Sequence, residues 1–306
     1  MSFVVNYPNA FGEKKDFYMS GYLGPNLDNF VKGVINKNTS AVWIIDGRSG
    51  LGKTTLSFQI GCYTTLKVRE MLKKKKVPEH ELPTFTLDNV CWTPEKFIER
   101  LKNAKMGEVI ILDESMILSN RSVMSEMNKA TIIMMSMIRS KQLFIIFNAN
   151  SLFDLDKNLP LHRADMLLHV YAIDDKFASR GRYYCVPSAR GRLKYLYISG
   201  KKFYDYSKAM PAFRDRFTAW FPFDEKEYEK RKQEGIEKYF QKGLGLRVKN
   251  QIRQRDLAMV LAFKSGNSVK KISEEIDLGY TQAKIIIQRY KEQKLDEKIT
   301  EHPKFS

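Results

Sequence analysis

The stretch that most constrains the fold is a glycine-rich turn between an apolar segment and a helix-like segment, residues 41–57, AVWIIDGRSGLGKTTLS. It contains the spacing G-x-x-x-x-G-K-[ST], filled by Gly47, Gly52, Lys53 and Thr54. In this pattern backbone N–H groups surround a polyphosphate, the lysine reaches the outer phosphates and the hydroxyl holds Mg²⁺. Glycines let the main chain approach an anion closely, and the helix that follows points its positive dipole end at the phosphates. The sequence therefore predicts a nucleotide site, with a turn that binds nothing as the alternative.

We expect ATP to contact every residue of this turn and of the start of the helix. The expected contacts are Gly47, Arg48, Ser49, Gly50, Leu51, Gly52, Lys53, Thr54 and Thr55.

A second stretch, residues 108–115, reads EVIILDES. Its four apolar residues in a row predict a strand buried on both faces, and two carboxylates follow at the carboxyl end, where open α/β sheets hold their ligands. We expect Asp113 to hold Mg²⁺ together with Thr54, and Glu114 to orient and deprotonate the attacking water. An acidic turn without a role is the alternative, but the position about sixty residues after a phosphate-binding pattern favours the functional interpretation.

Two further polar residues follow predicted buried strands. The run LFIIF at 143–147 ends in Asn148, which we expect to sense the γ-phosphate or the water, with Asn150 as its rival. Arg163 precedes a strand predicted at 166–171, and an arginine there is placed to reach a neighbouring subunit's γ-phosphate as a finger. An ordinary surface salt bridge is the alternative for Arg163. The candidate catalytic residues are Lys53, Glu114, Asn148 and Arg163.

Composition adds a preference for a polyanionic partner. The 306 residues carry a formal charge of +17 and are 43% apolar, enough for one large core and a small appended module. A chain with this positive charge favours a nucleic-acid partner, although a solvated, lysine-rich surface would give the same net charge.

The three cysteines, Cys62, Cys91 and Cys185, are widely spaced and indicate neither a disulfide framework nor a zinc site. The N-terminus does not read as a signal peptide, and the apolar runs are too short to span a bilayer. We therefore expect a cytoplasmic protein with no membrane partner, in the host cytoplasm if the chain is viral.

The order of these segments resembles the P-loop ATPases with an additional strand and a catalytic glutamate, which include the AAA+, RecA and FtsK/HerA-type motors. GRSGLGKT follows the first core strand, LDES the third and Asn148 the fourth, while Arg163 precedes the fifth. The stretches VWIIDGRSGLGKTTLSFQ, RSKQLFIIFNANSLFDLDKNLPLHRADMLLHVY and GKKFYDYS are similar to the zonula occludens toxin (Zot)-like ATPases of viruses and mobile elements, over about residues 20–230. The resemblance implies an α/β P-loop NTPase fold with a central parallel sheet of order 5-1-4-3-2, the cofactors ATP and Mg²⁺, and movement of DNA. Unlike the filamentous-phage members, this sequence shows no membrane helix after the ATPase, so a membrane-anchored role is not implied.

Residues 172–210 alternate aromatic and basic residues in short segments punctuated by glycine and proline, which predicts a basic β-hairpin extension. Such a mixture suits phosphate contacts and base stacking, or equally a ribbon whose tyrosines pack on the core. The candidate DNA contacts here are Arg182, Arg192 and Lys194.

The run KGLGL at 242–246 indicates a linker, which divides the chain into an ATPase domain, 1–241, and an all-helical domain, 242–306. Helices are expected at 251–264, 268–276 and 281–293. Residues spaced like the inner face of a helix-turn-helix are Ile272, Ile276, Leu278, Ala283 and Ile287. Asp277 stands where the turn usually has glycine, and a helical hairpin for protein contact is the alternative. The expected DNA contacts are Lys270, Lys271, Tyr280, Thr281, Gln282, Lys284 and Gln288.

Together these features predict an ATP-hydrolysing motor, a homo-oligomer in a hexameric ring, that translocates or packages duplex DNA of a virus or mobile element. A portal or replication protein is a further candidate partner. Two other classes stay open: a replication helicase or helicase loader that prefers single strands, and an ATP-switched helix-turn-helix regulator.

Overall fold

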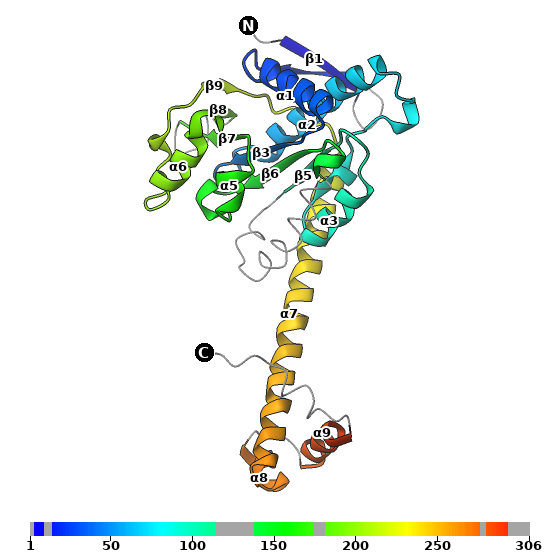
Figure 1. Cartoon of the computed structure of the whole chain (residues 1–306), viewed down its shortest axis with the longest axis vertical. Coiled ribbons are helices and arrows are strands. Elements are labelled where there is room, and N and C mark those ends of the chain that lie inside the picture. Colours follow the sequence, from blue (N-terminus) through cyan, green and yellow to red (C-terminus); the bar gives the residue numbers. More distant parts are fainter. Residues whose placement is uncertain (1–2, 9–13, 114–137, 174–180, 276–279, 293–306) are drawn as a thin grey trace. The chain divides into compact units, whose positions relative to one another are not determined.

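A computed structural model describes residues 3–8, 14–113, 138–173, 181–275 and 280–292 (Figure 1). The chain forms two compact units, Met1–Ile236 and Glu237–Ser306.

The larger unit is a mixed α/β structure built on a seven-stranded sheet of order β4-β5-β6-β3-β7-β8-β9. The strands are β3 Ala41–Asp46, β4 Val90–Cys91, β5 Val109–Leu112, β6 Phe144–Ala149, β7 Met166–Tyr171, β8 Arg182–Pro187 and β9 Phe213–Arg216. The first five in the sheet are parallel, and β8 and β9 extend it as antiparallel strands. Numbered along the chain, the parallel strands read 5-1-4-3-2 from the β7 side. Because they are parallel, their carboxyl ends all meet at one edge of the sheet.

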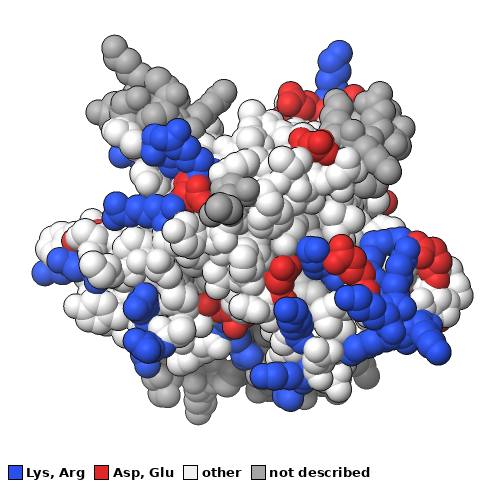
Figure 2. All heavy atoms as spheres, turned by 90° about the horizontal axis from the view of Figure 1, so that it is seen from above, with Lys and Arg blue, Asp and Glu red and all other residues white. Residues whose placement is uncertain are grey.

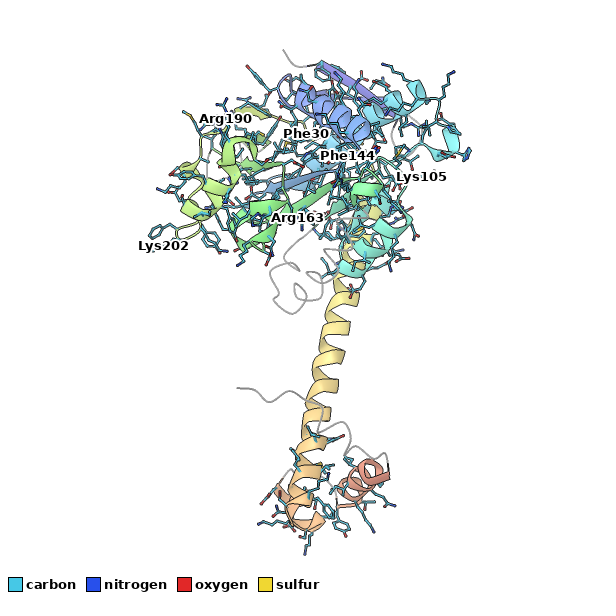
Figure 3. The ribbon with its side chains drawn as sticks, viewed as in Figure 1. Phe30, Lys105, Phe144, Arg163, Arg190 and Lys202 are labelled. Atoms are coloured by element: carbon cyan, nitrogen blue, oxygen red, sulfur yellow. The ribbon has the colours of Figure 1, made fainter. Side chains whose placement is uncertain are left out.

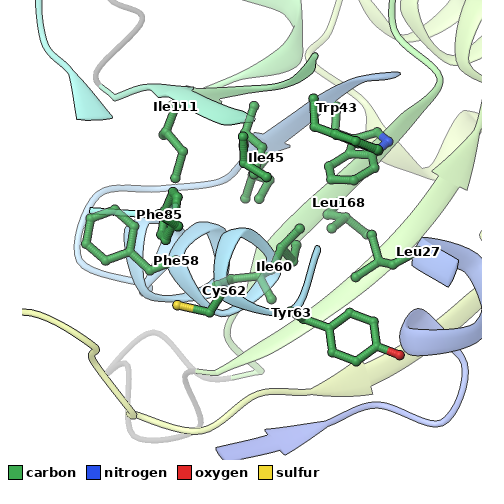
Figure 4. Close-up of a cluster of buried hydrophobic side chains, with 14 of the residues drawn as sticks. Leu27, Trp43, Ile45, Phe58, Ile60, Cys62, Tyr63, Phe85, Ile111 and Leu168 are labelled. Atoms are coloured by element: carbon green, nitrogen blue, oxygen red, sulfur yellow. The ribbon is translucent and has the colours of Figure 1, made fainter. Parts of the chain in front are cut away.

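Helices cover both faces of this sheet, as the uninterrupted apolar strands require. Successive residues of β3 point to opposite faces: Trp43 and Ile45 pack with α1 (Leu23–Lys37) and α2 (Lys53–Lys74). Figure 4 shows Trp43, Ile45 and their neighbours against the buried side of α2. The opposite face of the sheet packs with α3 (Pro94–Asn103) and α6 (Arg192–Gly200). The sheet core thus lies between two helical layers.

A hairpin at the start of the chain was not anticipated from the sequence. Strands β1 (Phe3–Pro8) and β2 (Lys14–Met19) pair antiparallel. The Phe17 ring stacks on Trp220, with 4.4 Å between ring centroids, so the hairpin is fixed to the segment after β9. Within the described residues, the other short elements of this unit are α5 Asn158–His162 and the 3-10 turns η1 Glu79–Glu81, η2 Leu87–Asn89, η4 Leu152–Asp154, η5 Ala189–Gly191 and η6 Tyr206–Lys208.

The predicted β-hairpin extension is wrong for residues 192–200, which form the helix α6. Leu193, Leu196, Tyr197 and Gly200 are buried, and this i, i+3, i+4, i+7 spacing is that of a helix face. The β-hairpin was predicted from the aromatic and basic content of this segment. The helical spacing of its apolar residues is the better guide, because it decides which side chains can be buried together on one face.

The predicted linker at 242–246 is also wrong, because these residues lie within α7, which runs continuously from Glu225 to Lys264. A glycine inside a helix costs only about 1 kcal/mol relative to alanine, so two glycines do not interrupt a long helix by themselves. The two compact units meet at residues 236 and 237, within that helix, and not at 241 and 242.

The smaller unit has its own core around the end of α7, α8 (Val269–Glu275) and α9 (Tyr280–Glu292). Met259, Ile272, Ala283 and Ile287 are buried together, so three residues of the predicted inner face are confirmed as core. The residues between α8 and α9, 276–279, which include Ile276, Asp277 and Leu278, lie outside the described residues.

In the part of the chain that the structure describes, no helix has the length and apolar character needed to cross a bilayer.

Candidate nucleotide-binding site

The turn between β3 and α2 depends on glycine at the positions of the motif. Gly47, Gly50 and Gly52 have φ angles of 135°, 80° and 95°, which side-chain-bearing residues rarely adopt. A Cβ on Gly47 would lie 2.2 Å from the backbone oxygen of Val170, while one on Gly50 would meet nothing within 4 Å. The loop therefore passes so close to β7 that only glycine fits at position 47.

Helix α2 begins at Lys53 and has no side-chain hydrogen bond at its N-cap and no acidic residue in its first turn. The first N–H groups of a helix have no partner within the helix and carry the positive end of its dipole. The start of this 22-residue helix is thus suited to bind an anion.

The Lys53 ammonium lies across the loop. Its Nζ donates to the backbone oxygens of Gly47 at 2.6 Å and Arg48 at 3.1 Å, and to Asn150 Oδ1 at 3.1 Å. These contacts hold the Lys53 ammonium over the turn, where the sequence motif predicts that the outer phosphates bind.

Asp113 directly follows β5 at the same edge of the sheet and is only 2% exposed. The Thr54 hydroxyl lies 3.3 Å from both of its carboxylate oxygens. A hydroxyl and a carboxylate side by side are the hard oxygen ligands that Mg²⁺ prefers, so the residues present fit this ion. Lys53, Thr54 and Asp113 all line one cavity.

Two other side chains fix the Asp113 carboxylate. Asn148 Nδ2 donates to Oδ1 at 2.8 Å, and the Tyr228 hydroxyl donates to Oδ2 at 2.5 Å. Burial and the neighbouring Asp113 carboxylate raise the pKa of Tyr228, so its phenol stays protonated and is a donor. Tyr228 lies 115 positions along the chain from Asp113. It was missed from sequence because it stands in a charged helix with no motif around it.

The two asparagines after β6 differ in position. Asn148 is 1% exposed, and its Oδ1 lies 2.5 Å from the Ser57 hydroxyl of α2. Asn150 is exposed and contacts Lys53. Asn148 therefore orients Asp113 from within the fold, whereas Asn150 lies beside the charge expected to meet the outer phosphates.

These residues open onto a cavity of about 560 Å³, within the range of small-molecule sites. One wall is the turn and the start of α2, and another is the segment 217–221, held to α2 by Gln59 Nε2, which donates to the oxygen of Thr218 at 2.7 Å. A further wall is the first two turns of α7, through Glu225, Tyr228, Glu229 and Lys232.

A buried network, which the sequence did not reveal, anchors the start of the turn. Asp46 directly precedes Gly47, is fully buried, and accepts hydrogen bonds from the Leu152 amide at 2.7 Å and from the Tyr206 hydroxyl. His169 Nδ1 of β7 lies 2.8 Å from the same carboxylate. The loop is thus tied to β7 and to the turn after β6, the elements that carry its neighbours Val170 and Asn150.

Arg163 is exposed and lies just before β7, at the opposite edge of the sheet from the turn. Residues of β3 and β7 pair in parallel from Trp43 with Met166 to Asp46 with His169, so Arg163 is not part of its own chain's pocket. Glu114, the predicted base, lies outside the described residues.

The predicted DNA contacts fall on both units. In the larger one, Arg182 and Arg192 are half-buried and Lys194 is exposed. Arg190 lies in η5, just before α6, and Lys202 follows α6; both are exposed and both are labelled in Figure 3. Figure 2 shows Lys and Arg gathered in groups on the face it draws. In the smaller unit the exposed residues among those predicted are Lys270, Lys271, Tyr280, Thr281, Lys284 and Gln288. Gln282 lies in α9, but its side chain is outside the described part.

Fold and site together define a class: a mixed α/β protein with a mostly parallel sheet and a glycine-rich turn at the carboxyl ends of its strands. No protein-family model matches the chain, and no curated protein matches it. Among solved structures, the chain is similar to B204, the DNA-packaging ATPase from Sulfolobus Turreted Icosahedral Virus, with 18% identity over 49% of this chain and 93% of that one and a TM-score of 0.29. EssC (ATPases 2 and 3) from Geobacillus thermodenitrificans matches with 11% identity over 61% of this chain and 42% of that one, with a TM-score of 0.22.

Proposed function

We propose that this chain is an ATP-hydrolysing motor that works on DNA as an oligomer. The observation that carries the proposal is the convergence of Lys53, Thr54 and Asp113 on one cavity of about 560 Å³ at the carboxyl edge of the sheet. A lysine over a glycine turn and a hydroxyl beside a buried carboxylate are the parts that phosphoryl transfer requires, because its catalysis is mostly positioning and charge stabilisation.

In this proposal the turn and the α2 amides hold the phosphates, Lys53 neutralises the outer ones, and Thr54 and Asp113 hold Mg²⁺. The ion, when bound, neutralises charge that develops on the β- and γ-phosphates. Glu114 is the proposed base, from its place in the sequence after Asp113. Asn150 lies beside Lys53, so we propose that it senses the γ-phosphate, while Asn148 uses its amide to hold Asp113.

DNA contact is proposed at two surfaces. One is α6 with the turns on either side of it, where cations lie beside exposed aromatic rings. Its exposed residues include Arg190, Lys194, Tyr195, Lys202 and Phe203. The other is α9, proposed as the recognition helix of a helix-turn-helix and supported by the buried positions Ile272, Ala283 and Ile287.

A replication helicase is the second candidate. Tyr195, Phe203 and Tyr204 are each more than half exposed next to lysines, and such rings stack on unpaired bases. Strand displacement of a forked duplex separates this candidate from a duplex translocase.

The test is ATP turnover of the purified chain alone, with single strands and with random duplex. The proposal expects basal turnover that DNA stimulates, and loss by at least about two orders of magnitude in Lys53→Ala. Turnover that random DNA leaves unchanged, combined with a footprint on one defined sequence, would instead support a nucleotide-switched regulator.

A further inference from the structure

The first two turns of α7 reach the nucleotide cavity from a part of the chain that carries no motif. Glu225, Tyr228, Glu229 and Lys232 line the cavity and are spaced by three and four residues, so they share one face of the helix. Only Tyr228 among them is buried, at 5% exposure.

The position of Tyr228 is fixed by its surroundings. Its ring contacts Phe58, Phe221 and Trp92, with ring centroids 5.6 to 5.8 Å apart. Phe58 belongs to α2 and Trp92 follows β4, so the ring is held between elements that flank the site. A rigid ring gives its hydroxyl little freedom to point elsewhere.

The neighbouring turns of α7 hold the helix in the same register. Arg231 Nη1 pairs with Asp88 Oδ1 at 2.7 Å, and Gly235 passes so close to Trp92 that a Cβ would lie 3.1 Å from the tryptophan Cβ. Tyr228, Arg231 and Gly235 thus form a docked side of α7 on the β4 end of the sheet.

We propose that Tyr228 is a positioning residue of the nucleotide and Mg²⁺ site. Its hydroxyl donates to Oδ2 while Asn148 donates to Oδ1, so the two donors together fix the rotation of the Asp113 carboxylate toward Thr54. Outer donors of this kind orient metal ligands, and their loss costs about 10- to 100-fold in metal affinity or activity. This proposal rests on the proposed function, because it requires that Asp113 binds the ion.

The test uses the full chain and a slowly hydrolysed ATP analogue. Its dissociation constant is measured with Mg²⁺ and with EDTA. The constant in EDTA divided by the constant with Mg²⁺ is the ratio that reports how much the metal strengthens binding. Tyr228→Phe keeps the ring packing and removes only the hydroxyl. We expect this ratio to fall about 10-fold or more in Tyr228→Phe, while the constant in EDTA stays within about twofold of the unchanged protein.

Tyr63→Phe is the matched control, because Tyr63 is equally buried and its hydroxyl donates to Asp28 at 2.9 Å on the α1 side of α2. It should leave the ratio unchanged. In an Asp113→Asn background, Tyr228→Phe should add no further loss, since the tyrosine acts through that carboxylate.

The outcomes separate the two proposals. If the unchanged protein does not bind the analogue with Mg²⁺, the proposed function fails. If it binds and Tyr228→Phe keeps the same ratio, or loses affinity equally with and without Mg²⁺, the positioning role is overturned and the function is untouched. Melting curves of each variant without ligand establish that the variant is folded.

Discussion

At the scale of single residues, the glycine-rich turn between β3 and α2 leaves no room for a side chain at position 47. We predict that Gly47→Ala abolishes ATP binding and lowers the melting temperature, because its Cβ would collide with the backbone of Val170. Gly50→Ala is the control: it also has a positive φ, worth about 1–2 kcal/mol of strain, but its Cβ meets nothing within 4 Å. Equal loss of ATP binding in both variants, measured by titration calorimetry, would contradict this account.

The site residues that could be predicted from the sequence are those that occur at a fixed spacing or directly after an apolar run. Gly47, Lys53 and Thr54 stand in one motif, and Asp113 ends an apolar run. Asp46, His169 and Tyr228 could not be found this way, because their roles come from contacts between segments more than 100 residues apart. Such contacts depend on the order of strands in the sheet and leave no local pattern.

At the scale of elements, α6 and the turns on either side of it carry exposed cations, and this placement gives a prediction. Replacing Arg190, Lys194 and Lys202 by glutamine should weaken DNA binding and reduce the slope of log affinity against log salt by about 2 to 3 if each cation contacts a phosphate. The matched control replaces exposed lysines of α1 and α2 and the turn that follows, Lys37, Lys74 and Lys76, which changes the net charge equally. Fluorescence anisotropy over a salt series measures both slopes. Equal slopes in the two triple variants would remove α6 as a contact surface.

Elements were predicted well where burial and local period agree. The bounds of β3 and β7 follow from their apolar runs. Helix α3 begins at Pro94, and the hydroxyl of its N-cap residue Thr93 accepts a hydrogen bond from the Lys96 amide at 3.3 Å. Prediction failed at α6 because its aromatic and basic content obscured the helical spacing of its apolar residues. It failed at 242–246 because two glycines were taken to mark a linker, although these residues continue the helix α7.

At the scale of the whole molecule, Arg163 lies at the opposite end of the parallel strands from the turn, so a finger role for it requires a second copy of the chain. The six residues of β3 span about 20 Å, too far for Arg163 to serve its own pocket. We predict that Arg163→Ala binds ATP with unchanged affinity but has lost turnover, as expected for a finger supplied by a neighbour.

Mixing tests this directly, because Arg163→Ala keeps an intact pocket and Lys53→Ala keeps an intact arginine. Each variant alone should be inactive, and the mixture should regain turnover at sites formed by one copy of each. A mixture as inactive as its components, at concentrations where the unchanged protein is oligomeric and active, would show that Arg163 is not a finger.

The central claim is that Lys53, Thr54 and Asp113 form a site for ATP with Mg²⁺, and equilibrium binding of ATP tests it most directly. We predict one ATP per chain in the presence of Mg²⁺, weaker binding when EDTA removes the ion, and no binding by Lys53→Ala that is folded by its melting curve. A folded, unchanged protein that retains no ATP at millimolar concentration with Mg²⁺ would contradict the claim.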